Sequence, residues 1–128
     1  MTQCYVTGSV SGIIVVGGLI SFNYGEIENC YSTATTSGID YVAGLVVVNY
    51  NKMTKCYSSG AVLGEYETGG LICDNLDGIV TNCYWDVQTS GQSWSDGGIG
   101  KSTEEMKQLI TFDDWDFVNV WGIIENTT

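Results

Sequence analysis

Four cysteines recur along the chain at nearly constant spacing, and a tyrosine follows each of them. The steps between them are 26, 26 and 27 residues. Cysteine can form disulfides or bind zinc, but equivalent positions on stacked strands lie about 4.8 Å apart, wider than the roughly 3.8 Å between Cβ atoms in a disulfide. A straight row also does not converge tetrahedrally on a metal ion. We therefore expect a structural cysteine column of buried free thiols that pack as small apolar groups: Cys4, Cys30, Cys56 and Cys83.

A fifth cysteine, Cys73, lies outside this column. The odd total disfavours a complete disulfide framework.

The tyrosines form the candidate binding face. Their rings could stack on sugars or pack against a protein partner. Tyrosine and threonine are also good strand formers, and such neighbours stabilise a sheet by about 0.2–1 kcal/mol a pair. Both interpretations stay open for this set: Tyr5, Tyr31, Tyr57 and Tyr84, with Thr7 and Thr33 beside them.

Other candidate chemistry is weaker. The segment 97–102 (GGIGKS) resembles a phosphate-binding loop, but the motif needs a glycine where Ser95 stands. Asp113, Asp114 and Asp116 could hold a cation weakly, although no EF-hand spacing occurs. The chain contains no Arg and no His, so general acid–base catalysis has few groups to use. We predict no catalytic residue, no metal site and no cofactor.

The cysteines belong to a repeat that keeps register in several other columns. Small-Gly-Leu triplets follow each of the first three cysteines at the same offset, and an asparagine follows each triplet: Gly17-Gly18-Leu19 and Asn23, Ala43-Gly44-Leu45 and Asn49, Gly69-Gly70-Leu71 and Asn75. The 27-residue step is explained by one extra residue in the turn 76–78. Such periodicity is typical of stacked repeats.

The repeat unit predicts the fold. Short runs of Val, Ile, Thr and Tyr between Gly, Asn and Ser indicate strands and turns. About 26 residues are too few for a strand–helix–strand crossover. We predict an all-β, right-handed parallel β-solenoid with about 26 residues per coil. Repeats 4–29, 30–55 and 56–82 form a first part, 1–82. The cysteines should face inward and the tyrosines and Asp86 outward, with a turn or kink at Lys55.

Residues 83–128 should form a degenerate last coil and a C-terminal cap. Ser102 and Glu105 fit a capping box, so we expect one short helix from about residue 103 to 110. A bulky apolar segment follows and could cover the open end of the core: Trp115, Phe117, Val118, Val120 and Trp121. The first coil has no such cap, which allows end-to-end self-association.

Charge and hydropathy exclude some partners. The net charge of −11 disfavours nucleic acid and anionic lipid. No apolar run reaches the 18 residues or so of a membrane span, so we expect no membrane insertion. Residues 13–20 are apolar but have no basic stretch before them, so we do not expect a signal peptide. The chain reads as a fragment, or a processed form, of a longer protein.

These patterns resemble the GLUG-motif repeat of bacterial and archaeal secreted or surface proteins. The resemblance is carried by Gly17-Gly18-Leu19-Ile20, Asn23, Ile27 and Asn29-Cys30-Tyr31-Ser32-Thr33, and by the ending from Cys83-Tyr84-Trp85-Asp86 onward. The chain departs from it at Ser21, Val47 and Cys73, where a glycine is expected.

The resemblance implies a non-enzymatic structural or adhesive module of an extracellular or cell-surface protein. A module that binds glycan or protein through the tyrosine face is the alternative. A carbohydrate-active enzyme on a solenoid scaffold is the third interpretation.

Overall fold

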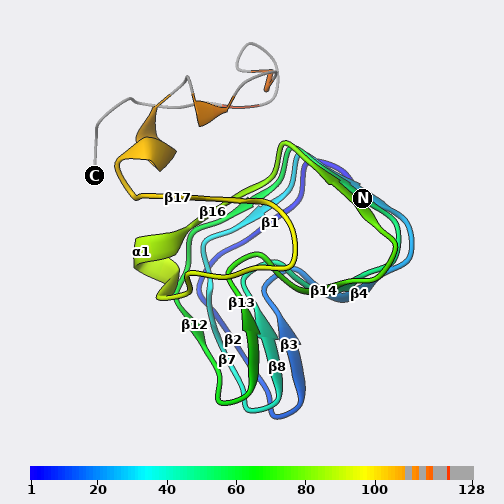
Figure 1. The fold of residues 1–128 in the computed structure, drawn as a ribbon, viewed down its shortest axis with the longest axis vertical. Coiled ribbons are helices and arrows are strands. Elements are labelled where there is room, and N and C mark those ends of the chain that lie inside the picture. Colours follow the sequence, from blue (N-terminus) through cyan, green and yellow to red (C-terminus); the bar gives the residue numbers. More distant parts are fainter. Residues whose placement is uncertain (109–110, 113–114, 117–120, 122–128) are drawn as a thin grey trace.

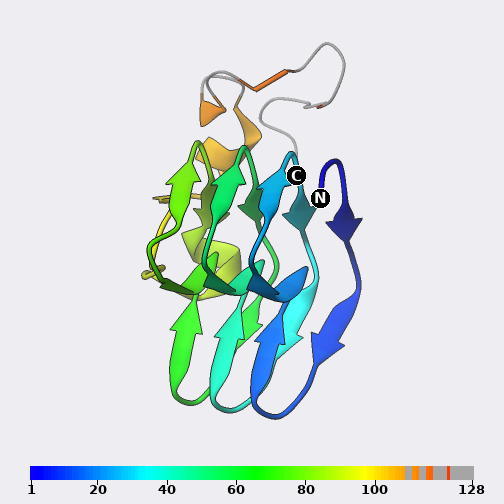
Figure 2. The same cartoon turned by 90° about the vertical axis from the view of Figure 1, so that its right-hand side faces the viewer.

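The computed structural model describes residues 1–108, 111–112, 115–116 and 121. In it the chain winds as a parallel β-solenoid of about three turns, as predicted (Figures 1 and 2). Each turn contributes one strand to each of five sheets, and every strand pair is parallel.

The strands stack as equivalent positions of successive coils. The first sheet contains β1 (Tyr5–Val6), β6 (Tyr31–Ser32), β11 (Tyr57–Ser58), β16 (Tyr84–Asp86) and β17 (Ile99–Lys101). The second contains β2 (Ser9–Ser11), β7 (Thr35–Ser37) and β12 (Val62–Leu63). The third contains β3 (Val15–Gly17), β8 (Tyr41–Ala43) and β13 (Glu67–Gly69). The fourth contains β4 (Ile20–Asn23), β9 (Val46–Asn49) and β14 (Ile72–Asn75), and the fifth β5 (Glu26–Glu28), β10 (Lys52–Thr54) and β15 (Ile79–Thr81).

The register follows the repeat residue by residue. Tyr31 pairs with both Tyr5 and Tyr57, which is the 26-residue step. Lys52 pairs with Ile79, a step of 27, whereas Asn49 still pairs with Asn75. The extra residue therefore lies in the turn 76–78, as predicted, and Asp77 there has a φ of 61°.

A left-handed residue precedes every cysteine of the column. Gln3, Asn29, Lys55 and Asn82 have φ between 52° and 56°. This confirms the turn expected at Lys55 and extends it to all four coils. The left-handed conformation costs most residue types about 1–2 kcal/mol, so the corner must be held by the pairing on either side of it.

Each coil is pinched into two lobes, visible in Figure 1. One lobe is filled by a cluster that includes Ile27, Leu45 and Met53, and the other by a smaller cluster with Val16 and Val42. At the pinch, a Cβ on Gly44 would lie 2.2 Å from the carbonyl oxygen of Gly70 and 2.7 Å from Ser58 Oγ. Glycine is therefore required there because the backbone approaches both the next coil and the opposite wall.

The facing prediction is confirmed for the interior of the second coil, whereas Cys4 of the first coil, expected to be buried, is exposed. Ser32, Ala34 and Thr36 are each at most 1% exposed, in line behind Cys30. Asp86, in contrast, was expected to face solvent and is 2% exposed. It is the N-cap of α1 (Val87–Ser90), its Oδ1 accepts hydrogen bonds from two backbone N–H groups of the helix, and the Thr103 hydroxyl donates to the same oxygen at 3.0 Å. These three donors satisfy Oδ1 of the carboxylate in its buried position.

A short helix lies in the cap, as predicted, but the segment of the capping box forms less helix than expected. The capping box forms, with Ser102 N donating to Glu105 Oε1 at 2.9 Å and Glu105 N donating to Ser102 Oγ at 3.1 Å. The helix that follows, η1 (Glu105–Lys107), is a single 3₁₀ turn. Residues 109–110 of the expected helix lie outside the described residues.

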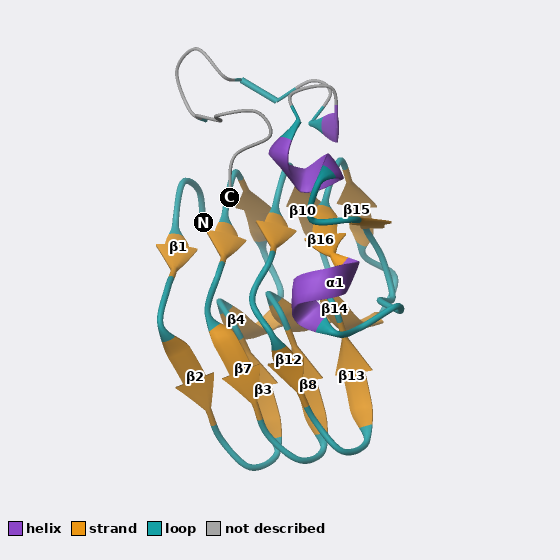
Figure 3. Ribbon diagram, turned by 90° about the vertical axis from the view of Figure 1, so that its left-hand side faces the viewer, coloured by secondary structure: helices purple, strands orange, loops and turns teal. Residues whose placement is uncertain are grey.

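At the end of the core, Trp85 packs in the cluster of the larger lobe and lies against Gly70. The segment 92–98, which follows α1, runs along the last coil (Figure 3). Three consecutive residues of this segment accept hydrogen bonds from backbone N–H groups of the last coil. Trp94 O accepts from Gly70 N, and Asp96 Oδ2 accepts from Asn75 N. Ser95 Oγ accepts from both Leu71 N and Ile72 N. Trp115 and Trp121 lie elsewhere, against the tyrosine row; Phe117, Val118 and Val120 lie outside the described residues. The expectation that the late aromatic segment covers the core end is therefore wrong for its two described tryptophans.

Candidate functional site

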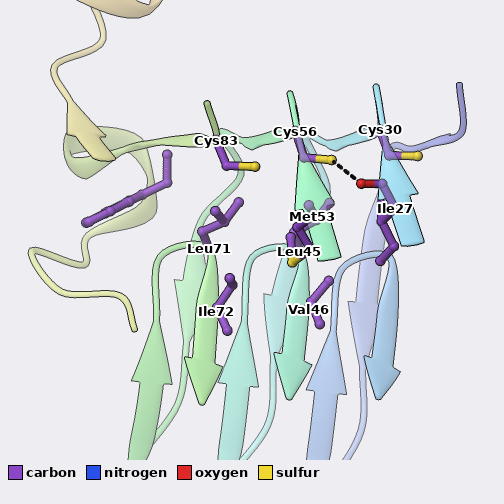
Figure 4. Close-up of a cluster of buried hydrophobic side chains, with 10 residues drawn as sticks. Ile27, Cys30, Leu45, Val46, Met53, Cys56, Leu71, Ile72 and Cys83 are labelled. Carbon is purple, nitrogen blue, oxygen red and sulfur yellow. Dashed lines mark hydrogen bonds between the residues drawn. The ribbon is translucent and has the colours of Figure 1, made fainter. Parts of the chain in front are cut away.

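The cysteine column lies inside the first lobe, where Figure 4 shows the sulfur atoms of Cys30, Cys56 and Cys83 in one file. All five cysteines are free thiols; Cys4 is exposed and the other four are buried. Each column thiol donates to the carbonyl two residues earlier, for example Cys30 Sγ to Glu28 O and Cys56 Sγ to Thr54 O, at 3.3 Å in both cases. These contacts fix the thiols along the wall of the coil.

Three of the four buried thiols have a raised pKa, whereas the pKa of Cys83 is lowered, chiefly by its hydrogen bond with Cys56. A hydrogen bond with Cys56, together with burial, raises the pKa of Cys30 far above its usual range. Burial, followed by the charge of Asp74, raises the pKa of Cys73 to about 12. A nucleophilic or metal-binding cysteine needs a thiolate, which these environments disfavour. In the described part of the chain, no three His, Cys, Asp or Glu side chains gather as metal ligands do.

The asparagine column forms a ladder with a direction. Asn23 Nδ2 donates to Asn49 Oδ1 at 2.8 Å, and Asn49 Nδ2 donates to Asn75 Oδ1 at 2.9 Å. Asn75 Nδ2 ends on Gly78 O at 3.0 Å. Asn49 is fully buried and Asn23 is 4% exposed. The sequence shows this column, but we assigned it no role; its burial makes it the principal polar element of the core.

The tyrosine row is partly covered. Tyr5, Tyr31 and Tyr57 stack in parallel, with centroids 5.2 and 4.9 Å apart. Tyr84 is 5% exposed, packed with Phe112 and Trp115, and burial raises the pKa of Tyr57 above its usual range. Tyr5 remains 62% exposed, and Thr7 and Thr33 are exposed.

Stacking limits what the row can bind. A sugar packs on the open face of an aromatic ring, but the ring faces in this row are already covered by the neighbouring tyrosines. The outer face of Tyr5 is not part of a stack among the described residues. That the row binds a partner stays a prediction.

A second pair of stacked tyrosines, which we did not include in the candidate binding face, lies directly after the asparagines of the ladder. Tyr24 and Tyr50 stack at 4.8 Å with an interplanar angle of 3°, and Tyr24 is 69% exposed. The signal was present, since both tyrosines directly follow an asparagine of the ladder.

The phosphate-loop interpretation is not supported by the local structure. Ile99–Lys101 is a strand, β17, paired in parallel with β16, and Ile99 N donates to Cys83 O at 2.9 Å. Lys101 lies 4.0 Å from Glu105. Of the aspartates considered for a cation, Asp113 and Asp114 lie outside the described residues.

No helix in the described part of the chain has the length and hydropathy needed to cross a bilayer. A relative, "Putative Gly-rich membrane protein" of Evansella cellulosilytica, is 46% identical over 48 residues. The match covers 36% of this chain and 6% of that protein, so the relative is far longer than the matched segment. No solved structure matches this chain.

The family model described as the GLUG motif matches residues 12–37, which span β3, β4, β5, β6 and β7. This match confirms the resemblance that the repeat pattern predicts: the chain carries the GLUG motif.

Proposed function

We propose that this chain is a non-enzymatic spacer segment of a longer extracellular or cell-surface protein. It sets the distance and orientation between whatever adjoins its two ends. The supporting observation is that its most reactive-looking side chains are used for internal contacts. Most of the column thiols are buried, the amides bond to one another along the ladder, and much of the tyrosine row lies under aromatic side chains of the same chain.

The proposed surface location rests on the two comparisons with known proteins. The GLUG match and the resemblance to a protein named as a membrane protein both favour a cell-envelope context. Net charge of −11 suits a solvated segment that does not adhere to anionic surfaces.

A spacer must tolerate a change in coil number. Duplication of residues 30–55 adds one complete coil in register, because Tyr31 and Tyr57 already pair with equivalent tyrosines on either side. We expect the longer protein to fold with equal or greater stability and to lengthen by about 4.8 Å along the stacking axis, the spacing of paired strands. Small-angle X-ray scattering and thermal unfolding measure both.

Two results would count against the proposal. One is loss of folding on duplication of residues 30–55. The other is saturable binding of a glycan panel that is abolished by Tyr31→Ala, since an adhesive module would then be the better description.

A further inference from the structure

We propose that the outer surface of three stacked turns binds a segment of a partner protein that carries both apolar and basic side chains. The turns are residues 12–15, 38–41 and 64–67, which join β2 to β3, β7 to β8 and β12 to β13, and we call their outer surface the tip. They lie side by side at the end of the molecule opposite η1 (Figures 1 and 2). This goes beyond the spacer role, because it gives the module a lateral contact of its own.

Backbone hydrogen bonds hold the three turns in register. Ile39 N donates to Ile13 O at 2.9 Å, and Tyr41 N donates to Ile14 O at 2.7 Å. The third turn repeats this pattern on the second, since Glu65 N donates to Ile39 O at 3.1 Å. Side chains at equivalent positions therefore form files along the stacking axis, about 4.8 Å apart. A surface fixed in this way loses little conformational freedom when a partner binds.

Large apolar side chains of the tip face solvent. Ile39 and Tyr41 belong to the second coil and have a coil on either side, yet they are 40% and 39% exposed. Their exposure is therefore a property of the outward surface of the turn and not of an end of the repeat array. Tyr66 of the third coil is 72% exposed, and Ile13 and Ile14 continue the patch on the first coil. Single exposed apolar residues are common on proteins, whereas a contiguous group marks an interaction site.

Acidic side chains lie among these apolar ones. Asp40 lies between Ile14 and Tyr66 in one file, and Glu65 and Glu67 flank Tyr66 in the third turn. The three turns contain no lysine, and among the described residues none of these carboxylates forms an ion pair. Carboxylates beside apolar surface are complementary to lysine or arginine of a partner.

The charges decide between the possible occupants of the tip. Two tips facing each other would bring Asp40, Glu65 and Glu67 close to the same carboxylates of a second copy, and each chain has a net charge of −11. An anionic lipid surface and a nucleic acid are repelled for the same reason. Aliphatic side chains such as Ile13 and Ile39 favour the apolar side chains of a protein over the hydroxyl groups of a sugar. A polypeptide segment with apolar and basic residues meets both requirements.

The arrangement of the tip also gives the partner a direction. The first turn presents Ile13 and Ile14, and the third presents Glu65 and Glu67, about 10 Å away by two strand spacings. The partner segment should therefore place its apolar side chains over the first and second turns and its basic side chains over the third.

The probe is a synthetic peptide in which serine alternates first with leucine and then with lysine. Alternate residues of an extended chain share one face, so the leucines and lysines of this peptide lie on the same side. About eight residues, roughly 26 Å when extended, reach across all three turns. The peptide is added to the isotope-labelled full chain under reducing conditions, and the backbone amides are followed by NMR.

We expect saturable changes in chemical shift at the amides of the tip, including Ile39, Asp40 and Tyr66. The amides of Glu26 and Ile79, which lie on another sheet, should not change. The dissociation constant should be on the order of 1 mM or tighter, because a short flexible peptide is ordered on a small surface. Peptides with serine in place of leucine, or glutamate in place of lysine, should bind the unaltered protein about fivefold more weakly or worse.

One pair of protein variants tests the charges. The double substitution Glu65→Gln and Glu67→Gln should weaken binding about threefold or more. The matched control is Glu26→Gln with Glu28→Gln, at exposed positions of β5 with the same spacing. Both double variants have the same net charge, and charges far from the peptide are screened at physiological salt. The control should therefore stay within about twofold of the unaltered protein.

A second pair tests the apolar contact. Ile39→Ser should weaken binding about threefold or more, because the isoleucine side chain is covered by the peptide. Ile79→Ser makes the same change at an exposed isoleucine of β15, outside the tip, and should leave binding within about twofold.

Four outcomes would overturn the proposal. They are absence of binding at the tip, equal weakening within either pair of variants, tip shifts that depend on protein concentration without peptide, and tip shifts caused by phosphatidylcholine vesicles but not by the peptide. The third outcome would indicate a second copy of the chain, and the fourth a lipid surface. None of them bears on coil duplication, so the spacer proposal is tested independently.

Discussion

Replacing Asn49 with leucine should remove the centre of the amide ladder without leaving a large cavity. Asn49 is fully buried, accepts from Asn23 at 2.8 Å and donates to Asn75 at 2.9 Å. In the variant, Asn23 Nδ2 keeps one long contact, 3.4 Å to Lys52 O, and Asn75 Oδ1 loses its ladder donor. A buried polar group left without a partner costs about 1–3 kcal/mol.

These two polar groups without partners should together lower the free energy of unfolding by about 3–4 kcal/mol. The partial exposure of Asn75 reduces this loss, and misfit of the branched leucine side chain increases it. A domain of this size has a total stability of about 6–15 kcal/mol, so the loss is a large fraction of it. The midpoint of thermal unfolding should fall by about 10 °C or more.

Urea unfolding followed by circular dichroism measures the free energy directly. The matched control is Asn51→Leu, the same substitution two residues away at an exposed position with one bond to Tyr24 O. We expect the control to cost about 1 kcal/mol or less. The reasoning is refuted if the two variants differ by less than about 1 kcal/mol.

Three further predictions concern the thiols, the aromatic cover and the pinch. In the native protein a thiol reagent should label Cys4 quickly and the buried cysteines only on unfolding. The pKa of Cys73 is raised from 9.0 to about 12 in the folded protein. The free energy of unfolding should therefore fall as the pH rises between these two values, because the Cys73 thiol of the unfolded chain loses its proton first. Trp115→Ala should cost about 3–5 kcal/mol in urea unfolding, against less than about 1 for the half-exposed Trp94→Ala, and equal losses would contradict the packing against Tyr84. Gly44→Ala should destabilise by more than about 2 kcal/mol, because the new methyl group meets backbone; a neutral result in thermal unfolding would mean that the two walls can separate freely.

The periodic part of the fold could be predicted because the same physical requirement is repeated in each coil. An inward position in a narrow interior accepts a small or apolar side chain, and Cys30, Ser32 and Ala34 meet that requirement. The strand register could also be predicted, including the extra residue before Ile79, because parallel stacking pairs residues that hold the same position in successive repeats.

The cap could not be predicted in the same way, because each of its contacts occurs once. Trp115 Nε1 donates to Asn82 O across 33 residues, and no spacing in the sequence indicates that partner. The burial of Asp86 had a local signal that we did not use. It precedes a four-residue helix and Gly91 ends that helix in the left-handed conformation, the usual N-cap and C-cap pair.

The pairing of aromatic residues from the C-terminal region with the outer tyrosines changes how the molecule should unfold. In a simple solenoid each repeat contacts only its neighbours, and melting can proceed from either end one unit at a time. Here Trp121 donates to Asn29 Oδ1 at 3.1 Å and contacts Tyr31 and Tyr57, while Trp115 contacts Tyr57 and Tyr84. These contacts join the end of the first repeat, at Asn29, to the second and third repeats and the last coil as one cooperative block. Fraying should therefore stop within the first repeat.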